Sequence, residues 1–308
     1  ALTPMTAGVG PITTDERKVR IARAQALLAE NGLQALIMAS GTSLEYFTGA
    51  RWGISERFFG CIITREGDPA WVTPAFEKAR ALEQVKIGKD VRAWEEHESP
   101  SALVASILKD RGVTAGKIGI EEMMPFTFAN AISKAAPATQ IVDGTPISAG
   151  CRMIKDAHEL ELLRLACRAT LTCYAAVFAA LQPGMTETTA TALLAAGYAR
   201  LGFRGSASVQ VGQYTALPHG SEEPQTIREN SIVMIDDGCV VEGYQSDISR
   251  TFVFGAPSAA QRKVWDEVHR GQEIAFAAAK LGAPAGASLA PNQWGTAPMG
   301  LIFQRFWR

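Results

Sequence analysis

The chain of 308 residues carries 30 Lys and Arg against 31 Asp and Glu, which gives a formal net charge of −1. Because this balance offers no basic surface for phosphates or anionic lipid headgroups, nucleic acid and a charged membrane surface are excluded as expected partners. The hydrophobic share of 47% and the charged share of 20% are those of ordinary globular proteins, and the length predicts two domains of about 150 residues.

Apolar runs and cysteines bear on membrane association and on the cellular compartment of the protein. No uninterrupted apolar run approaches the roughly 18 residues of a membrane span, so no membrane partner is expected. The five cysteines stand at irregular spacings without a CxxC pair. This pattern favours free, partly buried thiols over a disulfide framework, and it favours a cytoplasmic protein. Since the chain begins with Ala1 and not Met, an exported or periplasmic protein whose leader has been removed is the alternative.

The first half of the chain alternates helical and extended patterns after an irregular arm. Apolar residues at three- and four-residue spacing predict helices, and short apolar runs between turn residues predict strands. The expected helices are 15–31, 76–85, 100–112 and 126–135, and the expected strands are 33–40, 58–64, 70–74, 91–94, 117–120 and 139–142. Strands that alternate with helices predict an α/β domain over residues 1–150.

The second half, residues 151–308, is predicted to be α+β, with helices on one side of an antiparallel sheet. Asp156 and Glu159 form a capping-box pattern at the start of a long helix that continues to about Leu181. A second helix follows and ends near Arg200. Three strands and a last helix are then expected, at 208–212, 231–238, 243–255 and 258–282.

Residues 234–252 read MIDDGCVVEGYQSDISRTF and place acidic side chains around two apolar strands. If the turn centres between Val241 and Glu242, residues whose numbers sum to 483 face each other, and Asp236 lies opposite Asp247. Directly opposed residues of an antiparallel pair have Cβ atoms about 4.5–5.5 Å apart, so two carboxylates there repel each other. A divalent metal between them would remove the conflict.

The alternative needs no metal. In that interpretation the two aspartates accept hydrogen bonds and Arg250 neutralises one of them, and the spacing leaves both interpretations open. A third carboxylate, Asp237, points to the other face in this register and is expected to be solvated or hydrogen-bonded.

The same stretch resembles the signature IDxGxxxxGYxSDxTRTF of the pita-bread metallopeptidases, which include methionine aminopeptidase, aminopeptidase P and prolidase, while creatinase shares the fold. Three further segments resemble family motifs in the same order: RMIKDAHELELLRLAC (152–167), LQPGMTE (181–187) and LPHG (217–220). The first half resembles the creatinase-type domain of prolidase and aminopeptidase P, which methionine aminopeptidase lacks. The resemblance covers residues 12–282 and implies a creatinase-like N-terminal domain followed by a pita-bread catalytic domain.

The resemblance also implies roles for individual residues. Asp236 and Asp247 would bind two adjacent divalent ions, for which oxygen ligands favour Mn, with Co or Zn as alternatives. A water between the ions would attack the peptide bond. His219 would be catalytic and would contact the substrate. Independently of the resemblance, Tyr244 is a candidate to line the substrate pocket, with packing in the core or at the rim as the alternative.

The implied reaction is the hydrolysis of Xaa-Pro bonds in a proline-containing dipeptide or short peptide, by a homodimer. A dipeptidase that cleaves before a C-terminal proline is favoured over an aminopeptidase that removes the residue before proline. Two other classes remain open. One is a non-catalytic remnant that binds peptide or a partner chain, and the other is a metal-free C–N hydrolase similar to creatinase. The remaining histidines, His97, His158 and His269, carry no motif and are expected on the surface.

The family's ligand set, as the resemblance implies it, also contains a histidine and two glutamates. Beyond Gly255 the sequence offers only Glu267, His269 and Glu273, all within the predicted last helix. From about residue 283 the resemblance stops and acidic residues are absent. This indicates a changed reading frame or truncation, with a natural divergent tail as the alternative. We therefore expect an incomplete catalytic domain, little or no activity, and self-association through unpaired strand edges.

Overall fold

The computed structural model describes residues 2–217 and 219–284. Contacts divide the chain into two compact units, one of Gly10–Leu160 and one of Ala1–Val9 with Glu161–Arg308. The N-terminal arm therefore belongs with the second half, where the amide of Met5 donates to the carbonyl of Leu201 at 2.9 Å. The atypical tail that the sequence analysis singled out lies, from residue 285 on, outside the described residues.

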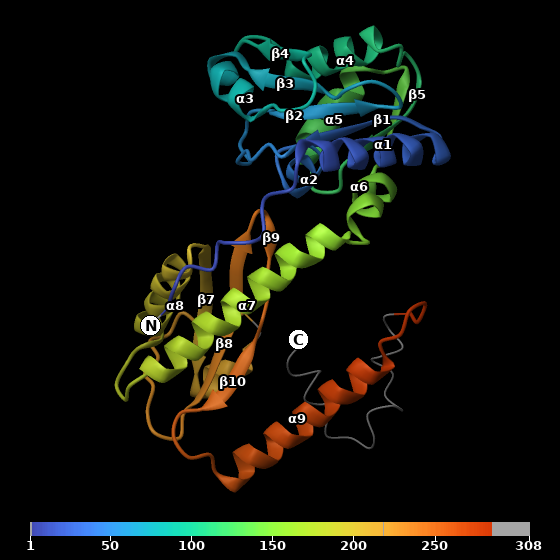
Figure 1. Ribbon diagram of the computed structural model, residues 1–308. Coiled ribbons are helices and arrows are strands. Elements are labelled where there is room, and N and C mark those ends of the chain that lie inside the picture. Colours follow the sequence, from blue (N-terminus) through green and yellow to red (C-terminus); the bar gives the residue numbers. More distant parts are fainter. Residues whose placement is uncertain (1, 218, 285–308) are drawn as a thin grey trace. The chain divides into compact units, whose positions relative to one another are not determined.

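A six-stranded sheet runs through the unit Gly10–Leu160, in the order β4-β3-β2-β1-β5-β6 (Figure 1). Strand β2 is antiparallel to its neighbours β1 and β3, and the other pairs are parallel. All six expected strands of this unit are present, so the α/β prediction is confirmed. Their bounds are β1 (Leu33–Ala39), β2 (Gly60–Thr64), β3 (Ala70–Pro74), β4 (Val91–Trp94), β5 (Gly116–Ile120) and β6 (Thr139–Asp143).

Helices cover both faces of this sheet. They are α1 (Thr14–Glu30), α2 (Thr42–Thr48), η1 (Ala75–Glu77), α3 (Lys78–Gln84), α4 (Pro100–Asp110), α5 (Phe126–Ala135) and α6 (Thr145–Arg152). The short helices α2 and α6 were not predicted. Each spans two turns, too few for a periodic apolar pattern to stand out, and α6 contains Pro146 and Gly150, which are typical of turns.

Strand β1 explains why the sheet is buried on both sides. Its side chains alternate, so Leu36 and Met38 pack in the core under α1, α2, α3 and α6, while Ala35 and Ile37 pack in the core under α4 and α5. A strand with two buried faces reads as a continuous apolar run and not as an alternating one. The run LQALIMAS shows this pattern in the sequence.

The second unit contains an antiparallel sheet in the order β10-β8-β7, with β9 paired to β8. Its elements are α7 (Ala157–Ala180), α8 (Glu187–Leu201), β7 (Arg204–Val211), η2 (Gly212–Ala216), β8 (Ile232–Val241), β9 (Tyr244–Gln245), β10 (Arg250–Val253) and α9 (Ala259–Ala278). Helix α7 contacts β8 through its buried face, where the hydroxyl of Tyr174 donates to the backbone of Asp237 at 2.8 Å. The α+β prediction for this half is confirmed.

Helix α7 is also, among the described helices, the one long and apolar enough to cross a membrane by length and composition alone. Of its most apolar 18-residue window, 44% is buried inside the protein. Buried residues recur along one side at helical spacing, as in Leu162, Ala166, Ala169 and Cys173. This is the pattern of a helix that packs one stripe against a sheet.

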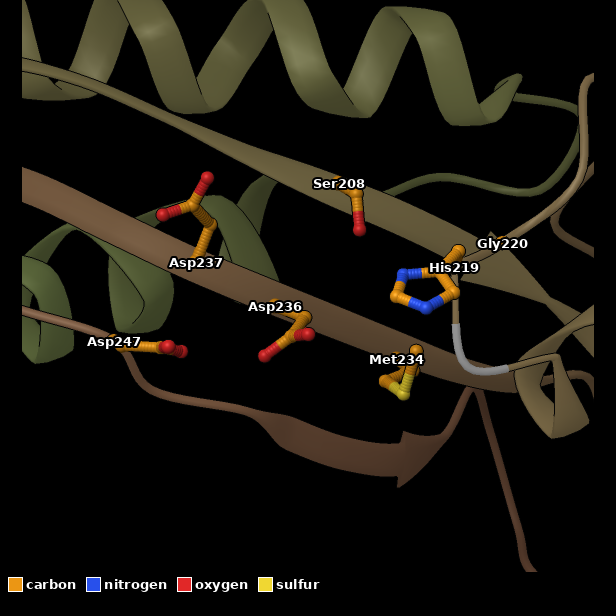
Figure 2. A pocket seen from close by; sticks show the side chains of 7 residues that line it. All are labelled: Ser208, His219, Gly220, Met234, Asp236, Asp237 and Asp247. Carbon is orange, nitrogen blue, oxygen red and sulfur yellow. The ribbon is translucent and has the colours of Figure 1, made fainter. Parts of the chain in front are cut away.

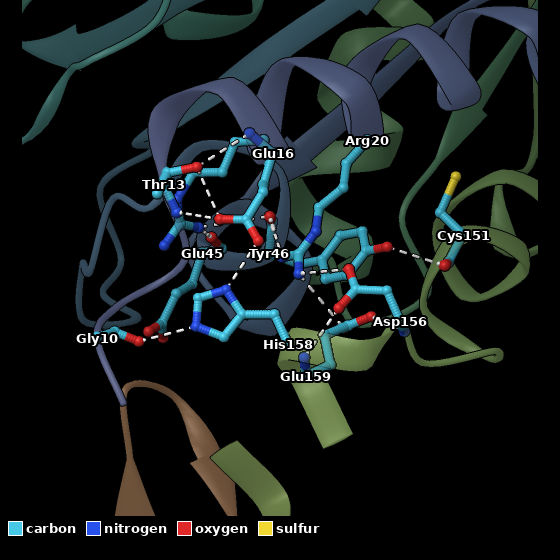
Figure 3. Close-up of polar contacts among 11 residues, drawn as sticks. Gly10, Thr13, Glu16, Arg20, Glu45, Tyr46, Cys151, Asp156, His158 and Glu159 are labelled. Carbon is cyan, nitrogen blue, oxygen red and sulfur yellow. Dashed lines mark hydrogen bonds and ion pairs between the residues drawn. The ribbon is translucent and has the colours of Figure 1, made fainter. Parts of the chain in front are cut away.

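The first turn of α7 is held by the capping box that the sequence predicts. The amide of Asp156 donates to Glu159, and the amide of Glu159 donates to Asp156, each at 2.8 Å. Glu159 is 2% exposed and forms an ion pair with Arg20 of α1 at 3.5 Å (Figure 3). The Arg20 guanidinium lies 4.1 Å from the ring centre of Tyr46, so a buried cation satisfies both a carboxylate and an aromatic face.

His158 corrects one expectation, because it is not a surface residue without partners. Its Nδ1 lies 2.7 Å from a Glu16 oxygen, and its Nε2 lies 3.0 Å from the Gly10 carbonyl (Figure 3). Both partners are acceptors, and only the imidazolium has two N–H donors. The bond with Glu16 raises the pKa of His158 above its ordinary value of 6.5, although burial opposes this. His269, by contrast, is exposed on α9 as expected.

Glu16 shows the complementary shift. Burial favours its neutral form, but hydrogen bonds from the side chain and backbone of Thr13 and from His158 lower its pKa from 4.5 to about 2. The carboxylate also closes a capping box at the start of α1. The ion pair therefore links the first turn of α1 to the first turn of α7 within this unit.

We expect this ion pair to make stability depend on pH in both directions. The contribution of His158 is complete below about pH 6.5 and is lost as pH rises through its raised pKa, while that of Glu16 is complete above about pH 4.5 and is lost towards pH 2. The urea midpoint of His158→Gln should therefore fall further below that of the parent at about pH 5.5 than at about pH 9. An equal difference at the two pH values would contradict the ion-pair account.

Candidate metal site

Asp236 lies on β8 and Asp247 lies in the segment between β9 and β10, and the register of this hairpin differs from the expected one. Ile235 faces Arg250 and Val240 faces Gln245, so paired residue numbers sum to 485 and not to 483. The turn centres between Glu242 and Gly243, one residue later than predicted. Both have positive φ, +50° and +88°, as a tight two-residue hairpin loop requires.

Asp236 is therefore not directly opposite Asp247, which corrects the prediction. In the observed register Ser249 lies opposite Asp236, and its hydroxyl donates to the Asp236 carboxylate. Moving one strand by two residues along its partner leaves each strand side chain on the same face of the sheet, because side chains alternate between the two faces with a period of two. Figure 2 shows the carboxylates of Asp236 and Asp247 turned towards each other, as diagonal neighbours on one face. The convergence that the sequence predicts is thus present with a different pairing.

Both carboxylates open into a pocket of about 330 Å³. It is lined by Ser208, His219, Gly220, Met234, Asp236, Asp237 and Asp247 (Figure 2). His219, predicted to be catalytic, is therefore brought together with both predicted metal ligands. Tyr244, the other predicted substrate contact, is not among the lining residues and stands opposite Val241 beside the turn. The roles of all four residues stay predictions.

The ion pairs of the described residues bear on whether a metal or Arg250 neutralises Asp236 and Asp247. Within residues 2–217 and 219–284, no ion pair includes Asp236 or Asp247. Arg250 instead donates to the Ser249 carbonyl at 2.8 Å. The interpretation in which Arg250 neutralises one aspartate is therefore wrong for this structure. Two converging carboxylates that no cation among the described residues neutralises form a donor set that fits a divalent ion.

The described residues supply only part of a metal site. No group of three or more His, Cys, Asp or Glu side chains in this part of the chain is arranged to hold an ion. Asp236 and Asp247 would thus contribute two carboxylate ligands, and the other ligands implied by the resemblance are not among the described residues. Glu267, His269 and Glu273 all lie on α9, as expected.

Asp237 shows how tightly the strand beside the site is held. It has a φ of +123°, a conformation that costs a residue with a side chain of order 1–3 kcal/mol. Its carboxylate accepts from the amide of Gly238 at 2.8 Å and from Nε2 of Gln245 at 3.1 Å. This confirms that Asp237 is hydrogen-bonded, and it identifies a strained residue next to a candidate ligand.

Several pocket residues were not found from the sequence. Ser208 pairs with Asp236 across β7 and β8, and Met234 pairs with Gln210. Their positions depend on the register between two strands separated by about twenty residues, for which the sequence contains no turn signal. Ser249 could have been found, since the Glu242–Gly243 turn alone places it opposite Asp236.

Comparisons with known proteins settle the family. Residues 20–154 match the model for the creatinase/prolidase N-terminal domain, and residues 161–289 match the model for metallopeptidase family M24. A Mycobacterium tuberculosis protein named probable dipeptidase PepE is 30% identical over 275 residues, which are 86% of this chain and 71% of that protein. The chain belongs to metallopeptidase family M24. The predictions of a peptidase and of a creatinase-like domain followed by a pita-bread domain are confirmed.

Two further relatives of this M24 chain are informative. The Xaa-Pro dipeptidase of Lactobacillus delbrueckii is 28% identical over 263 residues, covering 83% of the chain and 71% of that protein. The crystal structure of the prolidase from Thermococcus sibiricus superposes with a TM-score of 0.79 at 25% identity, over 91% of the chain and 77% of the prolidase. M24 peptidases use divalent metals, which agrees with the carboxylate pair found here.

The turn at Glu242 and Gly243 can be tested by one substitution. Gly243→Ala places a side chain at a φ of +88°, and we expect it to destabilise the protein by about 1 kcal/mol. The measurement is the urea midpoint. Gly53→Ala is the matched control, because Gly53 has no positive φ and an added Cβ would meet nothing within 4 Å. Equal midpoints for the two variants would show that the turn conformation is not as described.

Proposed function

We propose that this M24 chain is an Xaa-Pro dipeptidase, a metal-dependent hydrolase of dipeptides that end in proline. The observation that carries the proposal is the convergence of Asp236, Asp247 and His219 on one pocket, where no cationic side chain of the described residues pairs with the carboxylates. The names of two relatives, Xaa-Pro dipeptidase and prolidase, support the substrate class.

Each pocket residue has a chemical role in this proposal. Asp236 and Asp247 hold divalent metal through carboxylate oxygens, for which Mn is our first candidate and Co or Zn the alternatives. The bound metal supplies a water of lowered pKa and stabilises negative charge on the carbonyl oxygen under attack. His219 offers an N–H to the substrate, and Ser249 restrains one oxygen of Asp236. Met234 gives the pocket an apolar wall.

A dipeptide assay with Mn²⁺ tests the function. We expect proline to be released faster from Gly-Pro than leucine from Gly-Leu, and chelator to abolish both reactions. Loss of a residue that only contacts a metal ligand costs about 10- to 100-fold in metal affinity or activity. Asp236 is itself a ligand in this proposal, so Asp236→Asn should lower the rate by at least about 100-fold. Asp266→Asn, an exposed substitution on α9, is the control.

Other results of the same assay would identify the alternatives. Turnover that survives chelator would indicate a metal-free hydrolase of the creatinase type. Binding of Gly-Pro without metal and without turnover would indicate a non-catalytic peptide-binding protein. The absolute rate tests a separate prediction, that the chain is nearly inactive. A rate equal to that of the Lactobacillus delbrueckii enzyme would overturn that prediction. Dimer formation, self-association and a cytoplasmic location stay predictions.

A further inference from the structure

The backbone carbonyl of Asp237 joins the two segments that carry the candidate ligands. It follows Asp236 directly, and it accepts a hydrogen bond from the amide of Ile248, next to Asp247, at 3.0 Å. This bond crosses the hairpin where the regular pairing of β8 with β9 and β10 is interrupted. The orientation of the Asp237 peptide therefore affects where both carboxylates point.

A buried side chain from α7 holds the same carbonyl. The hydroxyl of Tyr174 donates to it at 2.8 Å, and Tyr174 is 4% exposed. Burial raises the pKa of the Tyr174 hydroxyl, which favours its protonated, hydrogen-bond-donating form. The carbonyl beside a strained φ of +123° thus has two donors, one from the hairpin and one from the helix.

One turn earlier on the same face of α7, Thr170 reaches the other ligand-bearing segment. Its hydroxyl lies 2.7 Å from that of Ser246, the residue before Asp247. The Ser246 hydroxyl in turn accepts from the amide of Cys239 at 3.0 Å. Thr170 and Ser246 are 0% and 2% exposed, so water does not compete for these bonds.

A third buried hydroxyl, from α8, supports Thr170. The hydroxyl of Tyr198, on α8, donates to the Thr170 hydroxyl at 3.5 Å. The side chains of Tyr174, Thr170, Ser246 and Tyr198 are all buried, and each hydroxyl has a hydrogen-bond partner. A network that is fully satisfied in a buried place fixes one arrangement of the groups attached to it.

We propose that Tyr174 and Thr170 are positioning residues of the metal site, which fix from one face of α7 the backbone beside Asp236 and Asp247. Neither touches the pocket, and both act through the strands that carry the carboxylates. The inference rests on the proposed function for its metal, but the positioning itself can be measured without metal. Partners of this kind are worth about 10- to 100-fold in metal affinity.

The test compares two removals of a phenolic hydroxyl. Tyr174→Phe deletes the bond to Asp237, and Tyr46→Phe deletes a bond of 2.9 Å to the Cys151 carbonyl in the other unit (Figure 3). Calorimetric titration with Mn²⁺ should show affinity weakened about tenfold in Tyr174→Phe and unchanged in Tyr46→Phe. Thr170→Val should weaken Mn²⁺ binding in the same direction.

Hydrogen exchange supplies a readout that needs no metal. The Ile248 amide should exchange about fivefold faster in Tyr174→Phe, the equivalent of one lost hydrogen bond, and at the parent rate in Tyr46→Phe. Mn²⁺ binding by the parent with unchanged affinity in Tyr174→Phe would overturn the positioning role. If the parent binds no Mn²⁺, the proposed function fails, and the exchange rate alone then supports or overturns the positioning.

Discussion

The tight turn at Glu242 and Gly243 is the constraint on which the site depends. It brings two strands together in a register that puts Asp236 and Asp247 on the same face. The two carboxylates are diagonal neighbours, and among the described residues neither forms an ion pair with a cationic side chain. The hairpin is held by buried hydroxyl groups of α7 and by hydrogen bonds around Asp237.

The sequence alone predicted most of the fold and the key feature of the site. Apolar runs of the right length identified every strand of the first unit, and the capping pattern of Asp156 and Glu159 identified where α7 begins. The predicted register of the hairpin was wrong, yet the two aspartates lie on one face, as predicted. Moving a turn centre by one residue changes the sum of paired residue numbers by two, which preserves the face of every side chain.

What the sequence could not predict depends on contacts between distant segments. The position of Ser208 beside Asp236 follows from the pairing of β7 with β8, which no local signal sets. The partners of His158 are provided by α1 and by the arm before it, so a lone histidine looked like a surface residue. The short helices α2 and α6 are stabilised by burial against the sheet, as the burial of Phe47 and Ile147 shows, and not by their own propensity.

Diffraction from crystals grown with Mn²⁺, recorded at the manganese absorption edge, tests the central claim most directly. The account predicts an anomalous peak within coordination distance of carboxylate oxygens of both Asp236 and Asp247. A map without a peak there, with the two side chains turned to opposite faces of the hairpin, would contradict it.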